Sequence, residues 1–268
     1  MLAEYGNLPF ETAASLAAKV SVSEPTVGRF CRTIGYNSFK DLKNNLRSDM
    51  GDQPWLIKDR LRDLQERTLA GEDQLTRGLE LEMAALVAIY EMAHTPEWDR
   101  VVKRLAAAPS IFVVGFQTER GIAEIFVHQL QYLRDKVHLL DLASGNFAEL
   151  LATNDKDAAL VIFEARRYSK HALLLAEEAK AAGIPVTLVT DPYCDWGHQV
   201  ADEIFVVPTS FNLFWESTAQ MASLANLLEN GVFVELGPQV EERMNDIARL
   251  YGKFTGHVDP TAIHKPKT

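Results

Sequence analysis

The stretch TAASLAAKVSVSEPTVGRFCRTIGY, residues 12–36, decides how this chain is organised. Residues 21–23 leave room only for a tight turn between two helical segments. Ser23 is placed to cap the second helix with its hydroxyl, Pro25 suits the first turn, and Gly35 follows the last apolar position. Two sets of apolar residues recur at the spacing of one helix face: Ala13, Leu16, Ala17 and Val20, then Val27, Phe30, Cys31 and Ile34. Two short helices joined by a tight turn predict a helix-turn-helix.

The face of the second helix opposite its apolar positions carries Pro25, Arg29 and Arg32, flanked by Thr26 and Gly28. Arginine can pair with guanine edges or with phosphates, and small neighbours let a helix approach the major groove closely. An ordinary solvated face of an αα-hairpin also tolerates two arginines. Spacing alone therefore leaves both interpretations open.

The run LAAKVSVSEPTVGRFCRTIGYNSFKDLK, residues 16–43, resembles the N-terminal domain of the RpiR (MurR/RpiR) family of bacterial transcription regulators. In that family a helix-turn-helix precedes a sugar isomerase (SIS) domain. The residues that carry the resemblance are Val22, Ser23, Thr26, Val27, Arg29, Phe30, Gly35 and Tyr36. The resemblance implies a bacterial DNA-binding regulator with a sugar-sensing second domain.

A third helix is predicted after a cap at Asn37–Ser38. Its apolar side is Phe39, Leu42 and Leu46, and its basic stripe is Lys40, Lys43 and Arg47. The stripe suits phosphate contacts that fix register on the duplex, and it equally suits a solvated helix face. We predict contacts with double-stranded DNA at Ser23, Thr26, Arg29 and Arg32, and contacts with phosphates at Lys40 and Lys43. Residues 1–10 are short for a full first helix, and we expect the true start to lie upstream of Met1.

Composition indicates a globular protein with two cores. The chain has 268 residues, 47% of them hydrophobic and 24% charged, with a net charge of −10 that lies outside the first 49 residues. The two cysteines, Cys31 and Cys194, indicate neither a disulfide framework nor a metal site. No run of apolar residues is long enough to span a bilayer, and no signal-peptide pattern appears. We expect a cytoplasmic protein without a cofactor.

Strand and helix patterns alternate from residue 111 onward. Strands are predicted at Ile111–Gly115, Val137–Leu140, Ala158–Phe163, Val186–Thr190 and Ile204–Val207. Helices are predicted at Gly121–Leu133, Phe147–Ala152, Ser169–Ala182, Asp195–Ala201, Phe214–Leu228 and Arg243–Tyr251. This alternation predicts an α/β fold with a parallel, doubly wound five-stranded sheet in the order 2-1-3-4-5, covered by helices on both faces.

The predicted organisation is a helix-turn-helix domain over residues 1–49, a linker over 50–75, a SIS-like domain over 76–254 and a flexible tail over 255–268. The helix Leu79–Ala93 is apolar on most sides and must be buried, against the next domain or against a partner subunit. We therefore expect a homodimer or a homotetramer.

Ligands of open parallel sheets bind beyond the carboxyl ends of the strands, where strand order reverses. Here that crevice lies between the first and third strands, whose loops each lead into a helix N-terminus. This half of the chain resembles the SIS domain, in which the two loops read G-x-G-x-S and S-x-S-G-x-T and bind a sugar phosphate. The corresponding candidates for effector binding are Gly115, Gln117, Thr118, Glu119, Glu164, Arg166, Arg167 and Ser169.

Most hydroxyl positions of those two motifs are replaced here, and Ser169 alone is retained. In one interpretation Arg166 and Arg167 replace the hydroxyls and bind the phosphate or carboxylate of a sugar derivative. In the other, the two arginines are structural, tied to Glu164 or Glu119, and the domain only dimerises. Glu216, on the predicted helix 214–228, is the nearest candidate for the base of an isomerase.

Together these patterns predict a DNA-binding transcription regulator whose SIS-like domain senses a sugar phosphate or a sugar acid. We expect no catalytic residues and no metal ion. The alternative is a phosphosugar isomerase or a phosphosugar-binding protein whose N-terminal segment makes some other contact. The basic face of the second helix, on an otherwise acidic chain, favours the regulator.

Overall fold

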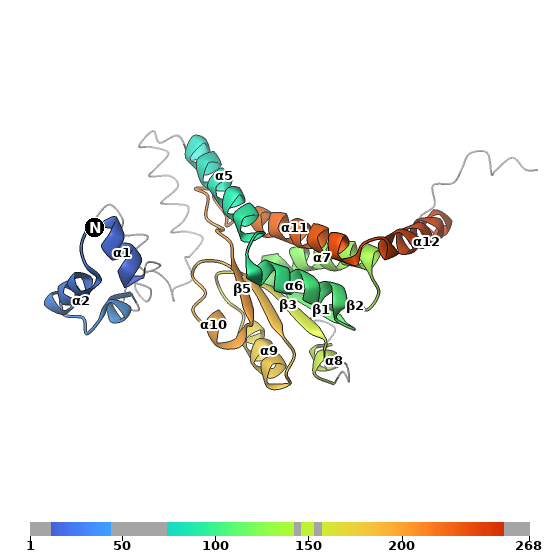
Figure 1. Ribbon diagram of the computed structural model, residues 1–268, viewed down its shortest axis with the longest axis horizontal. Helices are drawn as coiled ribbons and strands as arrows, with labels where there is room; N and C mark the ends of the chain where they lie inside the picture. The colour runs from blue at the N-terminus through green and yellow to red at the C-terminus, as the bar shows by residue number, and fades with distance from the viewer. Residues whose placement is uncertain (1–11, 44–73, 142–145, 153–156, 255–268) are drawn as a thin grey trace, which may run out of the picture. The chain divides into compact units, whose positions relative to one another are not determined.

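The computed structural model describes residues 12–43, 74–141, 146–152 and 157–254. The chain divides into two compact units. Residues 12–43 belong to the first, and residues 78–211 and 216–254 to the second. Each unit is described by itself below, and the ribbon is shown in Figure 1.

The first unit contains the predicted helix-turn-helix. Helix α1 (Ala13–Lys19) and helix α2 (Glu24–Thr33) are joined by a tight turn in which Ser21 has a φ of 54°. A further helical segment begins at Phe39. Six side chains form the core: Leu16, Ala17, Val27, Cys31, Phe39 and Leu42. Gly35 follows the C-cap of α2, as the sequence predicts, and its φ of 97° suits glycine best.

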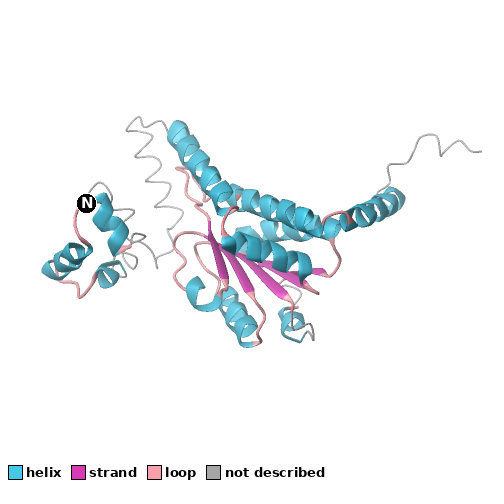
Figure 2. Ribbon diagram, viewed as in Figure 1, coloured by secondary structure: helices cyan, strands magenta, loops and turns pink. Residues whose placement is uncertain are grey.

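The second unit is built on a five-stranded parallel sheet in the order β2-β1-β3-β4-β5, which confirms the predicted fold class and strand order. The strands are β1 (Ile111–Gly115), β2 (Val137–Leu140), β3 (Ala159–Glu164), β4 (Val186–Thr190) and β5 (Glu203–Val206). All residues of β3 and β4 are buried, because helices cover both faces of the sheet (Figure 2).

Two hydrophobic cores lie on the two faces of this sheet. One face is covered by α5 (Gln74–Met92), α6 (Pro96–Ala107), α7 (Arg120–Leu133) and α11 (Ala219–Leu236). The other is covered by α8 (Phe147–Ala152), α9 (Lys170–Ala181) and α10 (Gly197–Val200). The last helix, α12 (Gln239–Phe254), packs against α7 and α11. A short 3-10 turn, η3 (Gln117–Glu119), connects β1 to α7.

Two helix predictions near the C-terminus were wrong in their bounds. The helix predicted over 214–228 begins at Ala219, so that Phe214 and Glu216 lie in the loop after β5. It continues to Leu236 and stops before Gly237, which has a φ of 64°. Helix α12 begins four residues earlier and ends three residues later than the predicted 243–251. Apolar spacing marked the buried faces of these helices but not their ends.

Helix α5 is only half buried, whereas the sequence predicted burial on most sides. Ala85 and Ile89 face the core. Several large apolar side chains of this helix are exposed: Leu75, Leu79, Met83, Leu86, Val87 and Tyr90. Burial against its own domain therefore accounts for one side of α5, and burial of the other side by a partner subunit stays a prediction.

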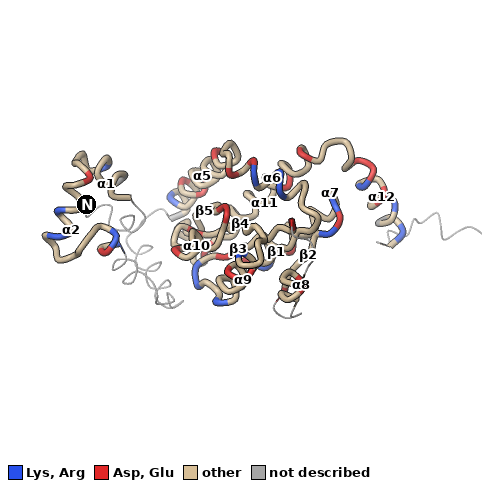
Figure 3. Tube along the Cα trace, turned by 60° about the horizontal axis from the view of Figure 1, so that its bottom comes forward, with Lys and Arg blue, Asp and Glu red and all other residues tan. Residues whose placement is uncertain are grey.

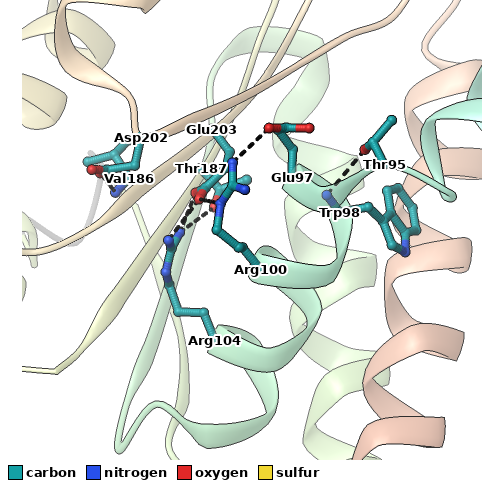
Figure 4. Close-up of polar contacts among 9 residues, drawn as sticks. All are labelled: Thr95, Glu97, Trp98, Arg100, Arg104, Val186, Thr187, Asp202 and Glu203. Carbon is teal, nitrogen blue, oxygen red and sulfur yellow. Dashed lines mark hydrogen bonds and ion pairs between the residues drawn. The ribbon is translucent and has the colours of Figure 1, made fainter.

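A cluster of charged side chains fixes α6 to the edge strand β5 (Figure 4). Glu203, only 3% exposed, lies between Arg100 and Arg104. The Nη2 atom of Arg104 donates to Glu203 Oε1 at 2.9 Å, and the Nε atom of Arg100 donates to the same oxygen at 3.3 Å. Neighbouring Asp202 accepts a hydrogen bond from the backbone of Val186 at 2.8 Å.

Within the described part of the chain, no helix combines the length and the apolar character needed to cross a membrane. Residues 50–73 of the predicted linker, the tail, residues 1–10 and the side chains of Leu46 and Arg47 lie outside the described residues, whereas α5 begins at Gln74, inside that linker. The predictions made for them, and the predicted domain boundaries, therefore stay predictions.

Candidate functional site

The outer face of α2 carries a connected set of polar side chains. Arg29 donates through Nη2 to the hydroxyl of Thr26 at 3.2 Å, and that hydroxyl shares a hydrogen bond with Ser23 at 2.8 Å. Ser23 and Arg29 are exposed and Thr26 is half buried. Gly28 has open space where a side chain would be. The first two turns of α2 thus present an oriented arginine and two hydroxyls on one surface.

Two details of α2 differ from the predictions. Ser23 does occupy the N-cap position, but its hydroxyl shares a hydrogen bond with the Thr26 hydroxyl and does not cap the helix. The backbone N–H groups of Thr26 and Val27 donate to the backbone carbonyl of Ser23 instead. Phe30 and Ile34 were assigned to the buried face, but they are 40% and 45% exposed. Among the described residues of this unit six side chains form the core, and α2 contributes two of them, Val27 and Cys31.

The helical segment that begins at Phe39 is capped as predicted. The Ser38 hydroxyl accepts from the backbone N–H of Asp41 at 3.1 Å, and the Asp41 carboxylate accepts from the backbone N–H of Asn37 at 2.9 Å. Lys40 is exposed, and the Nζ atom of Lys43 lies 5.8 Å from the centre of the Phe39 ring. Basic residues therefore lie on both α2 and this segment (Figure 3).

In the second unit, the loops after β1 and β3 lie at the same edge of the sheet because the two strands are paired. Gln117, with a φ of 52°, donates through Nε2 to the backbone oxygen of Arg167 at 2.6 Å. Arg167 has a φ of 74°. This bond joins the two loops that the sequence placed on either side of the crevice. Gln117, Thr118 and Arg167 are exposed.

Ser169 and Glu164 are used within the fold. The Ser169 hydroxyl caps α9 by accepting from the backbone N–H of His171 at 3.2 Å. The backbone N–H of Ser169 donates to Glu164 Oε1 at 2.8 Å. Glu164 is 1% exposed, and its Oε2 atom has no hydrogen-bond partner among the described residues. The retained hydroxyl of the SIS motif is thus a helix cap here.

Arg166 contacts Asp191 and Tyr193, which the sequence patterns did not single out, and Glu216, which they singled out only as a candidate base. Its backbone N–H donates to Asp191 Oδ2 at 2.9 Å, and its guanidinium carbon lies 3.5 Å from the centre of the Tyr193 ring. Its Nη1 atom lies 3.5 Å from Glu216 Oε1. The structural interpretation, in which the arginines are tied to Glu164 or Glu119, therefore named the wrong carboxylate for Arg166. Its position directly after β4 is the sequence feature that could have identified Asp191 as a residue of this site.

Carboxyl groups are concentrated at this edge. Burial raises the pKa of Glu119, and the nearby charges of Glu216 and Asp191 raise it further. Burial also raises the pKa of Glu164 to about 8, with smaller contributions from Glu119 and Asp191. Glu164 thus favours the protonated form near neutral pH, in which it does not repel an anion, and the pKa of Glu119 is shifted in the same direction.

Comparison with known proteins agrees with both halves of the chain. A family model described as the helix-turn-helix domain of the rpiR family matches residues 2–53, and a SIS domain model matches residues 104–229. The chain thus carries an rpiR-family helix-turn-helix followed by a SIS domain. An uncharacterised HTH-type transcriptional regulator from Haemophilus influenzae is 26% identical to this chain over 185 residues. The match covers 65% of this chain and 61% of the length of that relative.

Two solved structures share the fold. The sugar isomerase domain of an RpiR transcription factor from Sphaerobacter thermophilus aligns with a TM-score of 0.60 and 17% identity. The alignment covers 66% of this chain and 99% of that domain. The NanR protein of Vibrio vulnificus, complexed with ManNAc-6P, aligns with a TM-score of 0.57 and 17% identity. That alignment covers 94% of this chain and 89% of NanR.

Gly115 is the candidate whose position the fold constrains most tightly. A Cβ atom there would lie 2.3 Å from the backbone oxygen of Glu119, so Gly115→Ala must displace the η3 turn. We expect a loss of about 1–3 kcal/mol in the free energy of unfolding, measured by urea denaturation. The matched control is Gly121→Ala, because nothing lies within 4 Å of that site in α7. The control should stabilise the protein slightly, and a similar loss in both variants would contradict the prediction.

Proposed function

We propose that this chain is a DNA-binding transcription regulator in which α2 is the recognition helix. The observation that carries the proposal is the hydrogen-bonded series of Ser23, Thr26 and Arg29 on the outer face of α2, within a domain that matches the rpiR-family helix-turn-helix. Thr26 orients the Arg29 guanidinium and uses one of its five donors, which leaves the others for a guanine edge or a phosphate. Arg32 and Lys40 extend the basic surface, and Lys43 adds a phosphate contact.

We propose further that the SIS domain binds a small anionic sugar derivative, a sugar phosphate or a sugar acid. NanR, a structural neighbour, is complexed with ManNAc-6P, which supports this class of ligand. The proposed site is the edge formed by the loops after β1, β3 and β4, with Arg166 and Arg167 as its cationic residues. Ligand binding there would favour one arrangement of two subunits and so change the separation of their recognition helices.

In this proposal the protein is a regulator and not an isomerase. Glu216, the candidate base, lies in the loop after β5, and its Oε1 atom is 3.5 Å from Arg166 Nη1. The alternative, a phosphosugar isomerase, is tested directly by incubation with a panel of sugar phosphates, in which any turnover would contradict the proposal. A homodimer or homotetramer, formed through the exposed side of α5, is the proposed assembly.

The decisive experiment titrates the full chain with DNA from upstream of its own gene, with and without a panel of sugar phosphates and sugar acids that includes ManNAc-6P. Tight, salt-sensitive binding that one compound changes is the expected result. Binding that no compound changes would leave the DNA-binding function and remove the effector function. Absence of binding, with the folded state verified by circular dichroism, would contradict the regulator itself.

Arg29→Ala should weaken binding to the specific DNA more than binding to random DNA. The expected loss is about 1–3 kcal/mol, since one oriented arginine that reads a base edge contributes about that much discrimination. Lys40→Ala is the matched control, because removing a side chain that binds only phosphate should weaken both affinities equally and lower the salt slope by about one. Fluorescence anisotropy on the two DNA sequences measures both. An equal effect of Arg29→Ala on both sequences would assign Arg29 to phosphate binding only.

A further inference from the structure

The side chain of Arg166 is fixed in place before any ligand reaches it. Asp191 holds the backbones of both Arg166 and Tyr193, the residue that the Arg166 side chain packs against. Its carboxylate accepts from the backbone N–H of Arg166 at 2.9 Å and from that of Tyr193 at 3.0 Å. Asp191 is 1% exposed. The guanidinium lies against the Tyr193 ring at 3.5 Å, a cation–π contact that engages its flat face and leaves the edge with its N–H donors.

These edge donors are poorly satisfied. The Arg166 side chain is 19% exposed, yet its guanidinium makes no hydrogen bond to any residue that the structure describes. Its contact with Glu216 Oε1, at 3.5 Å, is an ion pair without hydrogen-bond geometry. Strong arginine–carboxylate pairs are shorter and bidentate. The Glu216–Arg166 pair is therefore of the kind that a better-fitting anion can replace.

The position of Glu216 allows a ligand to displace its carboxylate from the Arg166 guanidinium. Glu216 lies in the loop after β5 and three residues before α11 begins, and its side chain is 18% exposed. Glu164, two residues before Arg166, contributes a second unsatisfied group, since its buried Oε2 atom has no partner among the described residues. Because burial raises the pKa of Glu164 to about 8, this carboxyl group favours the protonated form near neutral pH and adds little negative charge beside an anion.

We propose that Glu216 acts as an internal competitor for the effector: its carboxylate occupies the Arg166 guanidinium, and the acidic group of the ligand displaces it. This inference rests on the proposed effector function of the same site. A neutral sugar has no group that can exchange with a carboxylate on a guanidinium, so the competitor also selects for an acidic ligand. Displacement would free the loop that carries Glu216 from the loop that carries Arg166, which links occupancy of the site to the segment between β5 and α11.

The test measures binding of inorganic phosphate, the simplest anion of this class, by isothermal titration calorimetry on the full chain. Glu216→Gln should bind phosphate about tenfold more tightly than the wild type, because it removes the competing charge and keeps the size of the side chain. Arg166→Ala should abolish binding, and Arg166→Ala combined with Glu216→Gln should not recover it. Glu235→Gln, on the exposed side of α11, is the matched control for net charge and should bind like the wild type.

The outcomes separate this inference from the proposed function. Phosphate binding that is equal in the wild type and in Glu216→Gln, and abolished in Arg166→Ala, would overturn the competition and leave the anion site intact. A gain in Glu216→Gln that persists without Arg166 would also overturn it, because the effect would then be a general change of potential. No binding of phosphate to any variant would contradict both the competition and the anion site. Thermal unfolding of each variant confirms that it is folded.

Discussion

Glu203→Ala should lower the free energy of unfolding of the SIS domain by about 3 kcal/mol. Removing one partner of a buried ion pair typically costs about 3–5 kcal/mol, since the remaining charge is left without compensation. We expect a loss at the lower end of this range because the side chains of Arg100 and Arg104 are 53% and 21% exposed, so water can hydrate their charges once Glu203 is removed. Glu203 is also the first residue of the edge strand β5, so its removal releases that strand from α6 (Figure 4).

Urea denaturation of the full chain, followed by circular dichroism, measures this destabilisation. Glu97→Gln is the matched control, because Glu97 pairs with the same Arg100 in solvent and its removal should leave the unfolding midpoint unchanged. Replacing the pair by apolar residues, Glu203→Leu with Arg104→Met, should recover most of the stability. If Glu203→Ala were no more destabilising than Glu97→Gln, the cluster would contribute nothing to the attachment of β5.

Glu229→Gln should stabilise the protein at alkaline pH and have little effect at acidic pH. Glu229 lies on α11 and is 8% exposed, and burial raises its pKa to about 8. The amide nitrogen of Gln129, on α7, can donate to both of its oxygens at 2.8 and 2.9 Å. Burial makes the neutral form the one that the fold accommodates, against the hydrogen bonds from Gln129, which favour the carboxylate. Each pKa unit corresponds to about 1.4 kcal/mol, so raising the pKa from 4.5 to about 8 destabilises the charged form by on the order of 5 kcal/mol.

The direction follows from proton binding. Between the usual pKa of a glutamate, 4.5, and the raised value of about 8, the folded state holds a proton that the unfolded state has released. The stability of the wild type should therefore fall as pH rises through this window and level off above it. Glu229→Gln removes that part of the slope. The slope contributed by Glu164, whose pKa is also raised to about 8, remains in the variant.

Denaturation midpoints at pH about 5, 7 and 9 measure the difference between variant and wild type. Glu235→Gln provides the control, since this residue is exposed on the same helix. The control should show no gain with rising pH. A constant difference between Glu229→Gln and the wild type at all three pH values would mean that Glu229 is charged in the folded protein throughout.

Local sequence patterns determined most of the architecture. Apolar runs of four to six residues, separated by helical periodicity, predicted each of the five strands to within one residue at either end, and the strand order followed from the general preference of such sheets. The helix-turn-helix followed equally well, from apolar spacing and from Gly35 at the end of α2. Such features depend on neighbours in the chain, so the residues carry them without help from distant contacts.

The sequence predicted the ends of helices and the exposure of their apolar faces less well. Phe30 and Ile34 have the spacing of buried residues, but among the described residues they are 40% and 45% exposed and stand outside the core cluster. Helix α11 begins at Ala219 and not at Phe214, because periodicity does not distinguish an apolar loop from an apolar helix turn. Periodicity indicates which side of a helix is apolar, but tertiary packing decides how much of that side is covered.

The sequence by itself determined that the chain has a helix-turn-helix and a parallel α/β domain, and it placed Arg166 in the loop after the third strand. Only the tertiary structure decided what Arg166 contacts. Asp191, Tyr193 and Glu216 are 25, 27 and 50 positions away in the numbering of the chain, and they reach Arg166 because they follow β4 and β5, the next two strands beside β3 in the sheet. No local pattern encodes such contacts, since they arise from the pairing of strands and not from the spacing of residues.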